Sequence, residues 1–236
     1  MSPLVGPAGD CERIVDGLLN QPVNTISSLA FVVAGVVVLA LVRRQNSMGA
    51  PDVLIAGMSI LTGFGSAAFH GFGGRVAIWV HDASLAGLLA LLVSIEVFRR
   101  TRRRWNATPW WMAWAGIGIL AGFSSSTTST IAAGSAVAAF LLVLAPARWS
   151  QPDSKAAKET DRRRALLLPV ALLVAGYVVF LLSRTGGPLC DPDSLWQGHA
   201  VWHLVAGTGL AVYGVRIDRA APSAPRSLGP GPTSAD

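Results

Sequence analysis

Apolar runs of membrane-spanning length constrain this chain more than any other sequence feature. A helix needs about 20 consecutive apolar residues to cross the roughly 30 Å hydrocarbon core of a bilayer. The 236 residues contain seven such runs, and 52% of all residues are hydrophobic. The sequence therefore predicts an all-α integral membrane protein built as a bundle of seven transmembrane helices, at residues 23–42, 53–72, 76–98, 107–123, 131–147, 165–183 and 195–215.

The runs divide the chain into three parts. Residues 1–22 form an N-terminal segment outside the membrane, residues 23–215 form the membrane domain, and residues 216–236 are predicted to be a disordered tail rich in Ala, Pro, Ser and Gly. Because residues 1–22 lack the pattern of a cleavable signal peptide, we expect the first run to remain as an anchor. The basic stretch 150–164 is predicted to be a polar loop on the inner side.

The distribution of Lys and Arg sets the orientation, since these residues concentrate in cytoplasmic loops. With the N-terminus outside, sixteen of the nineteen basic residues fall in cytoplasmic loops and the tail, and only Arg13, Arg75 and Arg184 fall outside. We therefore expect a cytoplasmic C-terminus and a location in the plasma membrane. The net charge of +6 belongs to loops between apolar runs and gives no indication of nucleic-acid binding.

A His-x-x-x-His pair opens the last run. His199 and His203 are four residues apart, so on a helix they share one face and can reach one bound ion. The predicted topology places His70, near the outer end of the second run, at a similar depth. Three imidazoles with one open position are typical of a catalytic zinc site. His81 is a reserve ligand, because its neighbour Asp82 points about 100° away from it on a helix.

Asp82 and Ser66 are the candidates for catalysis around such a metal. Zinc acidifies water and polarises a carbonyl group. Asp82 could carry a proton from that water to a leaving amine, or it could orient a ligand imidazole. Ser66 lies one helical turn before His70 and could donate a hydrogen bond to a developing oxyanion. A nucleophilic Ser66 is the weaker alternative, because the sequence around it is not a nucleophile elbow.

Cys11 and Cys190 both fall outside the membrane in the predicted topology. An oxidising compartment would let them form a disulfide, with two free thiols as the alternative.

Three further features have structural interpretations. Glu96 is expected to pair with Arg99 and Arg100 at headgroup level. The glycines of the second run and the turn after it are expected to serve close helix packing; they are Gly63, Gly65, Gly71, Gly73 and Gly74. Four tryptophans are predicted to form an interfacial belt at the inner boundary; they are Trp105, Trp110, Trp111 and Trp149.

Several of these motifs together resemble the alkaline ceramidase family, within the CREST superfamily of seven-span membrane hydrolases and receptors. They are Cys11-Glu12, Asn24-Thr25-Ile26-Ser27-Ser28, Ser66-x-x-x-His70, Asp82 and His199-x-x-Trp202-His203. The resemblance implies the same zinc ligands, His70, His199 and His203, a proton-handling Asp82, an oxyanion-binding Ser66 and a disulfide between Cys11 and Cys190.

The family's calcium site finds only an incomplete match in the N-terminal segment. Glu12 coincides with one family ligand, whereas other positions fall on residues that are poor calcium ligands: Gly9, Ile14 and Gln21. Calcium binding would need Asp10 and Asp16 as substitutes.

The sequence as a whole predicts a zinc-dependent hydrolase that cleaves the amide bond of a long-chain membrane lipid, ceramide or a similar N-acyl amphiphile, near the outer face. The first alternative is a seven-span lipid receptor with a structural metal site. The second is an ion or proton translocator with Asp82 and the histidines as a relay, which is disfavoured because the polar groups gather on one side of the membrane.

Overall fold

The structure is a computed structural model that describes residues 9–45, 48–101, 103–121 and 153–217. In this part of the chain the regular elements are all helices, and the only β-type pairing is an isolated backbone bridge between Asp10 and Arg184. The predicted all-α class is confirmed for these residues. The helices are α1 (Pro22–Arg44), α2 (Ala50–Gly71), α3 (Arg75–Arg100), α4 (Thr108–Ala121), α6 (Asp153–Leu182) and α7 (Gly198–Ile217).

Four of the described helices are long and apolar enough to cross a membrane: α1, α2, α3 and the Arg164–Leu182 part of α6. The protein is therefore a multi-pass membrane protein by length and composition. Helix α4 has 14 described residues and α7 has 20, and neither is among the four. The predicted fifth run, 131–147, lies outside the described residues. The seven-span count and the orientation of the termini stay predictions.

Helix α6 begins earlier than the sequence analysis expected. The stretch predicted as a polar loop, 150–164, is helical from Asp153 onward. Ala, Lys, Glu and Arg dominate this stretch and are strong helix formers, so the helix can continue past the apolar run.

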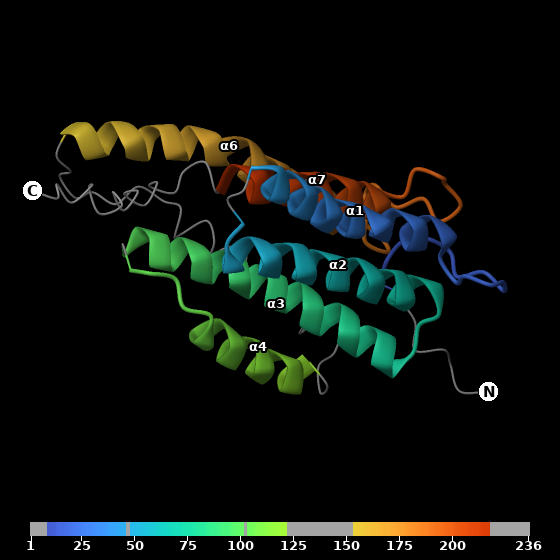
Figure 1. The fold of residues 1–236 in the computed structure, drawn as a ribbon. Coiled ribbons are helices and arrows are strands. Elements are labelled where there is room, and N and C mark those ends of the chain that lie inside the picture. The colour runs from blue at the N-terminus through green and yellow to red at the C-terminus, as the bar shows by residue number, and fades with distance from the viewer. Residues whose placement is uncertain (1–8, 46–47, 102, 122–152, 218–236) are drawn as a thin grey trace, which may run out of the picture.

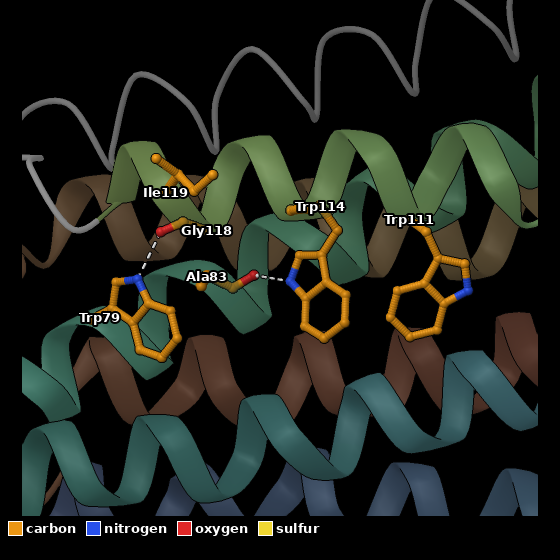
Figure 2. Close-up of a pocket in the computed structure, with 7 residues that line it drawn as sticks. Trp79, Ala83, Trp111, Trp114, Gly118 and Ile119 are labelled. Carbon is orange, nitrogen blue, oxygen red and sulfur yellow. Dashed lines mark hydrogen bonds between the residues drawn. The ribbon is translucent and has the colours of Figure 1, made fainter.

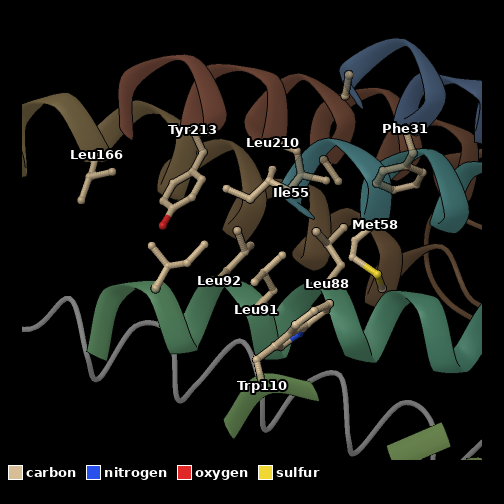
Figure 3. Packing of buried hydrophobic residues seen from close by; sticks show 13 residues of the cluster. Phe31, Ile55, Met58, Leu88, Leu91, Leu92, Trp110, Leu166, Leu210 and Tyr213 are labelled. Atoms are coloured by element: carbon tan, nitrogen blue, oxygen red, sulfur yellow. The ribbon is translucent and has the colours of Figure 1, made fainter. Parts of the chain in front are cut away.

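Each helix packs beside its neighbour across the bundle. The main contacting pairs are α6–α7, α7–α1, α1–α2, α2–α3 and α3–α4, as Figure 1 shows, and α2 and α7 make a smaller contact. The main apolar core draws on all six described helices (Figure 3). Its members include Phe31 of α1, Ile55 of α2, Leu91 of α3, Trp110 of α4, Leu166 of α6 and Leu210 of α7.

Glycines allow α2 to approach both of its neighbours. A Cβ atom at Gly63 would lie 2.6 Å from Val32 Cγ2 on α1, and one at Gly65 would lie 3.2 Å from the backbone nitrogen of His81 on α3. Close packing is thus confirmed at these two positions. Gly73 and Gly74 instead form the turn to α3. Their φ values of 67° and 86° are ones that residues with a side chain rarely adopt.

The structure corrects one interpretation at the Arg100 end of α3 and adds a contact to another. Glu96 is 1% exposed, and Tyr213 Oη donates a hydrogen bond to its carboxylate over 2.9 Å. The pairing of Glu96 with Arg99 and Arg100 at headgroup level stays a prediction. Trp110 is not an interfacial anchor, because it is 2% exposed and donates from Nε1 to the carbonyl of Gly87. Trp111 is 48% exposed, as a belt residue would be, and Trp149 lies outside the described residues.

Candidate metal centre

Three histidines meet at the end of the bundle where α1 begins, α2 ends and α7 begins. His70 is the second-last residue of α2, and His199 and His203 occupy the first two turns of α7. All three are buried, and one ligand nitrogen from each lies within 4.8 Å of the others. This is the only group of its kind among the residues that the structure describes, and it contains the pair predicted from the spacing together with His70, which was predicted from the topology.

Each imidazole is held through its Nδ1 atom by a different residue. His70 Nδ1 lies 2.8 Å from Gln21 Oε1, and His203 Nδ1 lies 2.9 Å from Ser27 Oγ. His199 Nδ1 lies 3.2 Å from Asp10 Oδ1. A hydrogen bond to the ring nitrogen that does not bind the metal orients a metal-binding histidine and selects its tautomer.

The partners' own hydrogen bonds decide where the protons lie. Gln21 Nε2 donates to the carbonyls of Asp10 and Glu12, so its oxygen must face His70 as an acceptor. Ser27 Oγ donates to the carbonyl of Asn24, which leaves its lone pairs for His203. A carboxylate only accepts, so His199 also donates from Nδ1 to Asp10. In its neutral form, each of the three imidazoles therefore keeps an unprotonated Nε2.

The Nε2 atoms fit a bound metal. Those of His70 and His199 are buried without a hydrogen-bond partner among the described residues. Buried polar atoms are rarely left unsatisfied, and an imidazole lone pair is a good zinc ligand. The donor set and its orphaned nitrogens therefore match a three-histidine metal site.

Ser66 stands beside this centre. Its hydroxyl is 3.4 Å from His203 Nε2 and 2.9 Å from Ser28 Oγ, and the residue is 1% exposed. The predicted proximity of Ser66 to the histidines is present in the structure.

Asp82 lies on α3, next to the centre rather than inside it. Its Oδ1 is 2.8 Å from His81 Nδ1, and the ring of His81 is 6.3 Å from that of His70. The ring of Phe69 contacts both imidazoles, with centroids 4.9 Å from each. His81, the reserve ligand, is not a member of the three-histidine group. The proton-handling role of Asp82 stays a prediction.

Comparison with known proteins bears on what such a centre does. A family model described as Ceramidase matches residues 17–221, which include α1 through α7 and the three histidines. The chain belongs to the ceramidase family. No curated protein and no solved structure matches it. Family membership implies a hydrolase that acts on the ceramide amide bond, and hence a lipid substrate.

Several contacts hold the N-terminal segment beside the α6–α7 connection, at the same end of the bundle as the centre. A disulfide joins Cys11 to Cys190, in the connection between α6 and α7, as predicted. Arg13 forms an ion pair with Asp193 and donates its backbone N–H to the carbonyl of Pro192. Figure 1 shows this segment and the α6–α7 connection side by side at one end of the bundle.

The acidic residues considered for calcium serve separate tasks in the structure. Asp10 contacts His199, Asp16 is exposed, and Glu12 accepts hydrogen bonds from the backbone N–H groups of Val23 and Asn24. Glu12 thereby caps α1. Burial raises the pKa of Glu12, although these two hydrogen bonds oppose the rise. The described contacts give the calcium prediction no support.

Asp10 is the residue of the centre whose role the sequence analysis missed. Burial by itself would raise its pKa, but the neighbouring His199 and then Arg184 hold the pKa below its ordinary value. Asp10 is therefore a buried carboxylate beside a metal-ligand candidate. Gln21 and Ser27 were also missed, and the only sequence signal was their position in or just before the Asn24 to Ser28 motif.

An apolar pocket of about 540 Å³ lies between α3 and α4, and none of the three histidines of the centre lines it. Figure 2 shows Trp79 and Trp114 donating from Nε1 to the carbonyls of Gly118 and Ala83, so their polar atoms are satisfied. No titratable side chain lines it. The pocket therefore offers no group for acid–base or metal chemistry, whereas the three histidines do.

Proposed function

We propose that this member of the ceramidase family is a zinc-dependent intramembrane hydrolase of a long-chain N-acyl lipid, ceramide or a close analogue. The observation that carries the proposal is the set of three Nε2 lone pairs left available by Asp10, Gln21 and Ser27. When bound, zinc supplies Lewis-acid chemistry, polarising a carbonyl group and acidifying water.

The chain's own residues take the remaining roles. His70, His199 and His203 would hold the metal through Nε2. Ser66 Oγ, beside His203, donates a hydrogen bond to the amide oxygen as negative charge develops there. Asp82, held by His81, accepts a proton from the attacking water and delivers it to the leaving amine nitrogen. Hydrolysis then yields a fatty acid and an amine.

The position of the centre favours a lipid that stays in the bilayer. The histidines lie at one end of the helices, so a scissile amide at headgroup depth would meet them while the acyl chain lies along the bundle. The disulfide at the same end supports an extracytoplasmic, oxidising side, in agreement with the distribution of basic residues. Our proposal is accordingly a site near the outer face, with the plasma membrane as its location.

The first test is metal content in detergent-purified protein. We expect about one zinc per chain in the wild type and a sharp loss in His203→Ala, because three protein ligands are the minimum for a catalytic zinc site. His81→Ala is the matched control, since His81 is a nearby histidine outside the group of three. Fatty-acid release from an N-acyl sphingoid base, measured by mass spectrometry, should fall with the metal.

Three outcomes would contradict the proposal. Full amidase activity in His203→Ala would remove the metal from the mechanism. Complete metal loss in His81→Ala would make His81 a ligand. Saturable binding of the lipid without turnover by metal-loaded protein would favour the receptor alternative.

A further inference from the structure

The carboxylate of Asp10 faces the Nδ1 atoms of two of the three imidazoles. Its Oδ1 is 3.2 Å from His199 Nδ1, and its Oδ2 is 4.0 Å from His70 Nδ1. The residue is 8% exposed, so water screens these interactions little. Asp10 thus approaches the ligand histidines from the side opposite to the nitrogens that would hold a metal.

Asp10 carries a negative charge, unlike Gln21 and Ser27, which contact the Nδ1 atoms of the other two histidines. Gln21 and Ser27 are neutral, so they can orient His70 and His203 but cannot balance charge. Three neutral imidazoles around a divalent cation leave two positive charges in a medium of low dielectric constant. A buried carboxylate behind a ligand imidazole lowers that cost and raises the basicity of the ligand.

Asp10 lies outside any helix, so other contacts must hold it in place. Its backbone pairs with Arg184, and the backbone N–H of Thr185 donates to the carbonyl of Gly9 over 3.1 Å. The adjacent Cys11 is bonded to Cys190. Gln21 Nε2 donates to the Asp10 carbonyl from the other side.

The α6–α7 connection, which contains Arg184, Thr185 and Cys190, also leads directly into His199 at the start of α7. Gln197, two residues earlier, is 2% exposed and donates from Nε2 to the carbonyls of Asp191 and Ser194. The loop that anchors Asp10 is therefore ordered up to the first turn of α7. Both partners of the Asp10–His199 contact are held by one cross-linked unit.

We propose that Asp10 is a positioning residue of the metal centre: it orients His199 through Nδ1, compensates the charge of the bound ion and thereby sets metal affinity. This inference rests on the proposed function, because it presupposes that the three histidines hold zinc.

The test is zinc affinity, measured by competition with a chromophoric chelator in the purified full-length protein. Removing such a contact typically weakens metal binding by about 10- to 100-fold. We expect a loss in this range for Asp10→Ala. Asp10→Asn should lie between that variant and the wild type, because it keeps an acceptor oxygen but loses the charge. Unfolding temperatures of the metal-free proteins are measured alongside.

Asp16→Asn is the matched control. It makes the same charge change in the same N-terminal segment, at an exposed residue. Its zinc affinity should equal that of the wild type. If Asp10→Ala fails to fold, Asp10→Asn and the control still decide the question.

Two results would overturn the inference. Wild-type affinity in Asp10→Asn and Asp10→Ala would show that the contact is without consequence for the metal. Total metal loss in Asp10→Asn, as in His203→Ala, would make Asp10 a ligand. Absence of zinc from the wild type after reconstitution would instead refute the proposed function, so the two failures are distinguishable.

Discussion

At the scale of single residues, the direction of hydrogen bonds decides what the three histidines can bind. An isolated imidazole can present either nitrogen to a metal. Here Gln21 and Ser27 have committed their own hydrogens to backbone carbonyls, so they can only accept from Nδ1. The chemistry of the centre thus depends on neutral side chains that carry no metal-binding signature themselves.

Ser66→Ala tests the oxyanion role at this scale. Removing one hydrogen-bond donor to an oxyanion lowers kcat by roughly 100- to 1,000-fold. We expect a loss of that size in lipid-amide hydrolysis, with zinc content unchanged because Ser66 is not a ligand. Ser59→Ala is the control, since Ser59 is also buried on α2 but donates to the carbonyl of Ile55 in its own helix. A wild-type kcat in Ser66→Ala would exclude the role.

At the scale of helices, α2 is the element that brings the site together. It packs against α1, which contributes Ser27, and against α3, which contributes His81 and Asp82, and its own end contributes His70. The approach of α2 to α1 depends on Gly63, where a Cβ would lie 2.8 Å from the backbone nitrogen of Val32. A backbone atom cannot move aside as a flexible side chain can.

Gly63→Ala should therefore destabilise the bundle. Overpacking of this kind costs about 1–3 kcal/mol, and we expect the melting temperature in detergent to fall by several degrees. Gly57→Ala makes the same substitution on α2 where a Cβ meets no atom within 4 Å, so it should be neutral or slightly stabilising. Thermal unfolding followed by size-exclusion chromatography compares the two. Equal destabilisation would show that the α1–α2 contact is not the cause.

At the scale of the whole molecule, the Cys11–Cys190 bond joins residues that are 179 positions apart. Loop-closure entropy would assign such a bond about 5 kcal/mol against a random-coil unfolded state. A membrane-inserted chain is no random coil, because its helices persist in the bilayer. The bond should therefore act mainly on the segment that carries Asp10.

Reduction of this disulfide should accordingly loosen the centre without unfolding the helices. We expect zinc to dissociate severalfold faster after treatment with a phosphine reductant, with unchanged far-ultraviolet circular dichroism. The double variant Cys11→Ser/Cys190→Ser should release zinc at the rate of the reduced wild type and should not respond to the reductant. Identical zinc release by oxidised and reduced wild type would contradict the expectation.

The sequence predicted local features well and long-range polar contacts poorly. The cores of α1, α2, α3 and α7 follow their apolar runs, and the His199/His203 spacing indicated a shared face. For Glu96, the sequence indicated only the nearby Arg99 and Arg100, whereas in the structure Tyr213 of α7 also donates a hydrogen bond to its carboxylate. This hydrogen bond comes from a residue 117 positions away, which no local pattern reveals.

The sequence by itself determined the helical class and the apolar character of the spans, because both follow from short-range periodicity and length. It also indicated the three histidines as candidate metal ligands and the two cysteines as a candidate disulfide. Only the tertiary structure decided which nitrogen of each histidine is available to a metal and which residue contacts the other nitrogen. Asp10, Gln21 and Ser27 reach the histidines only because the disulfide and the packing of α1 against α2 and α7 bring distant segments together. Such contacts depend on the three-dimensional path of the chain, and sequence spacing does not encode them.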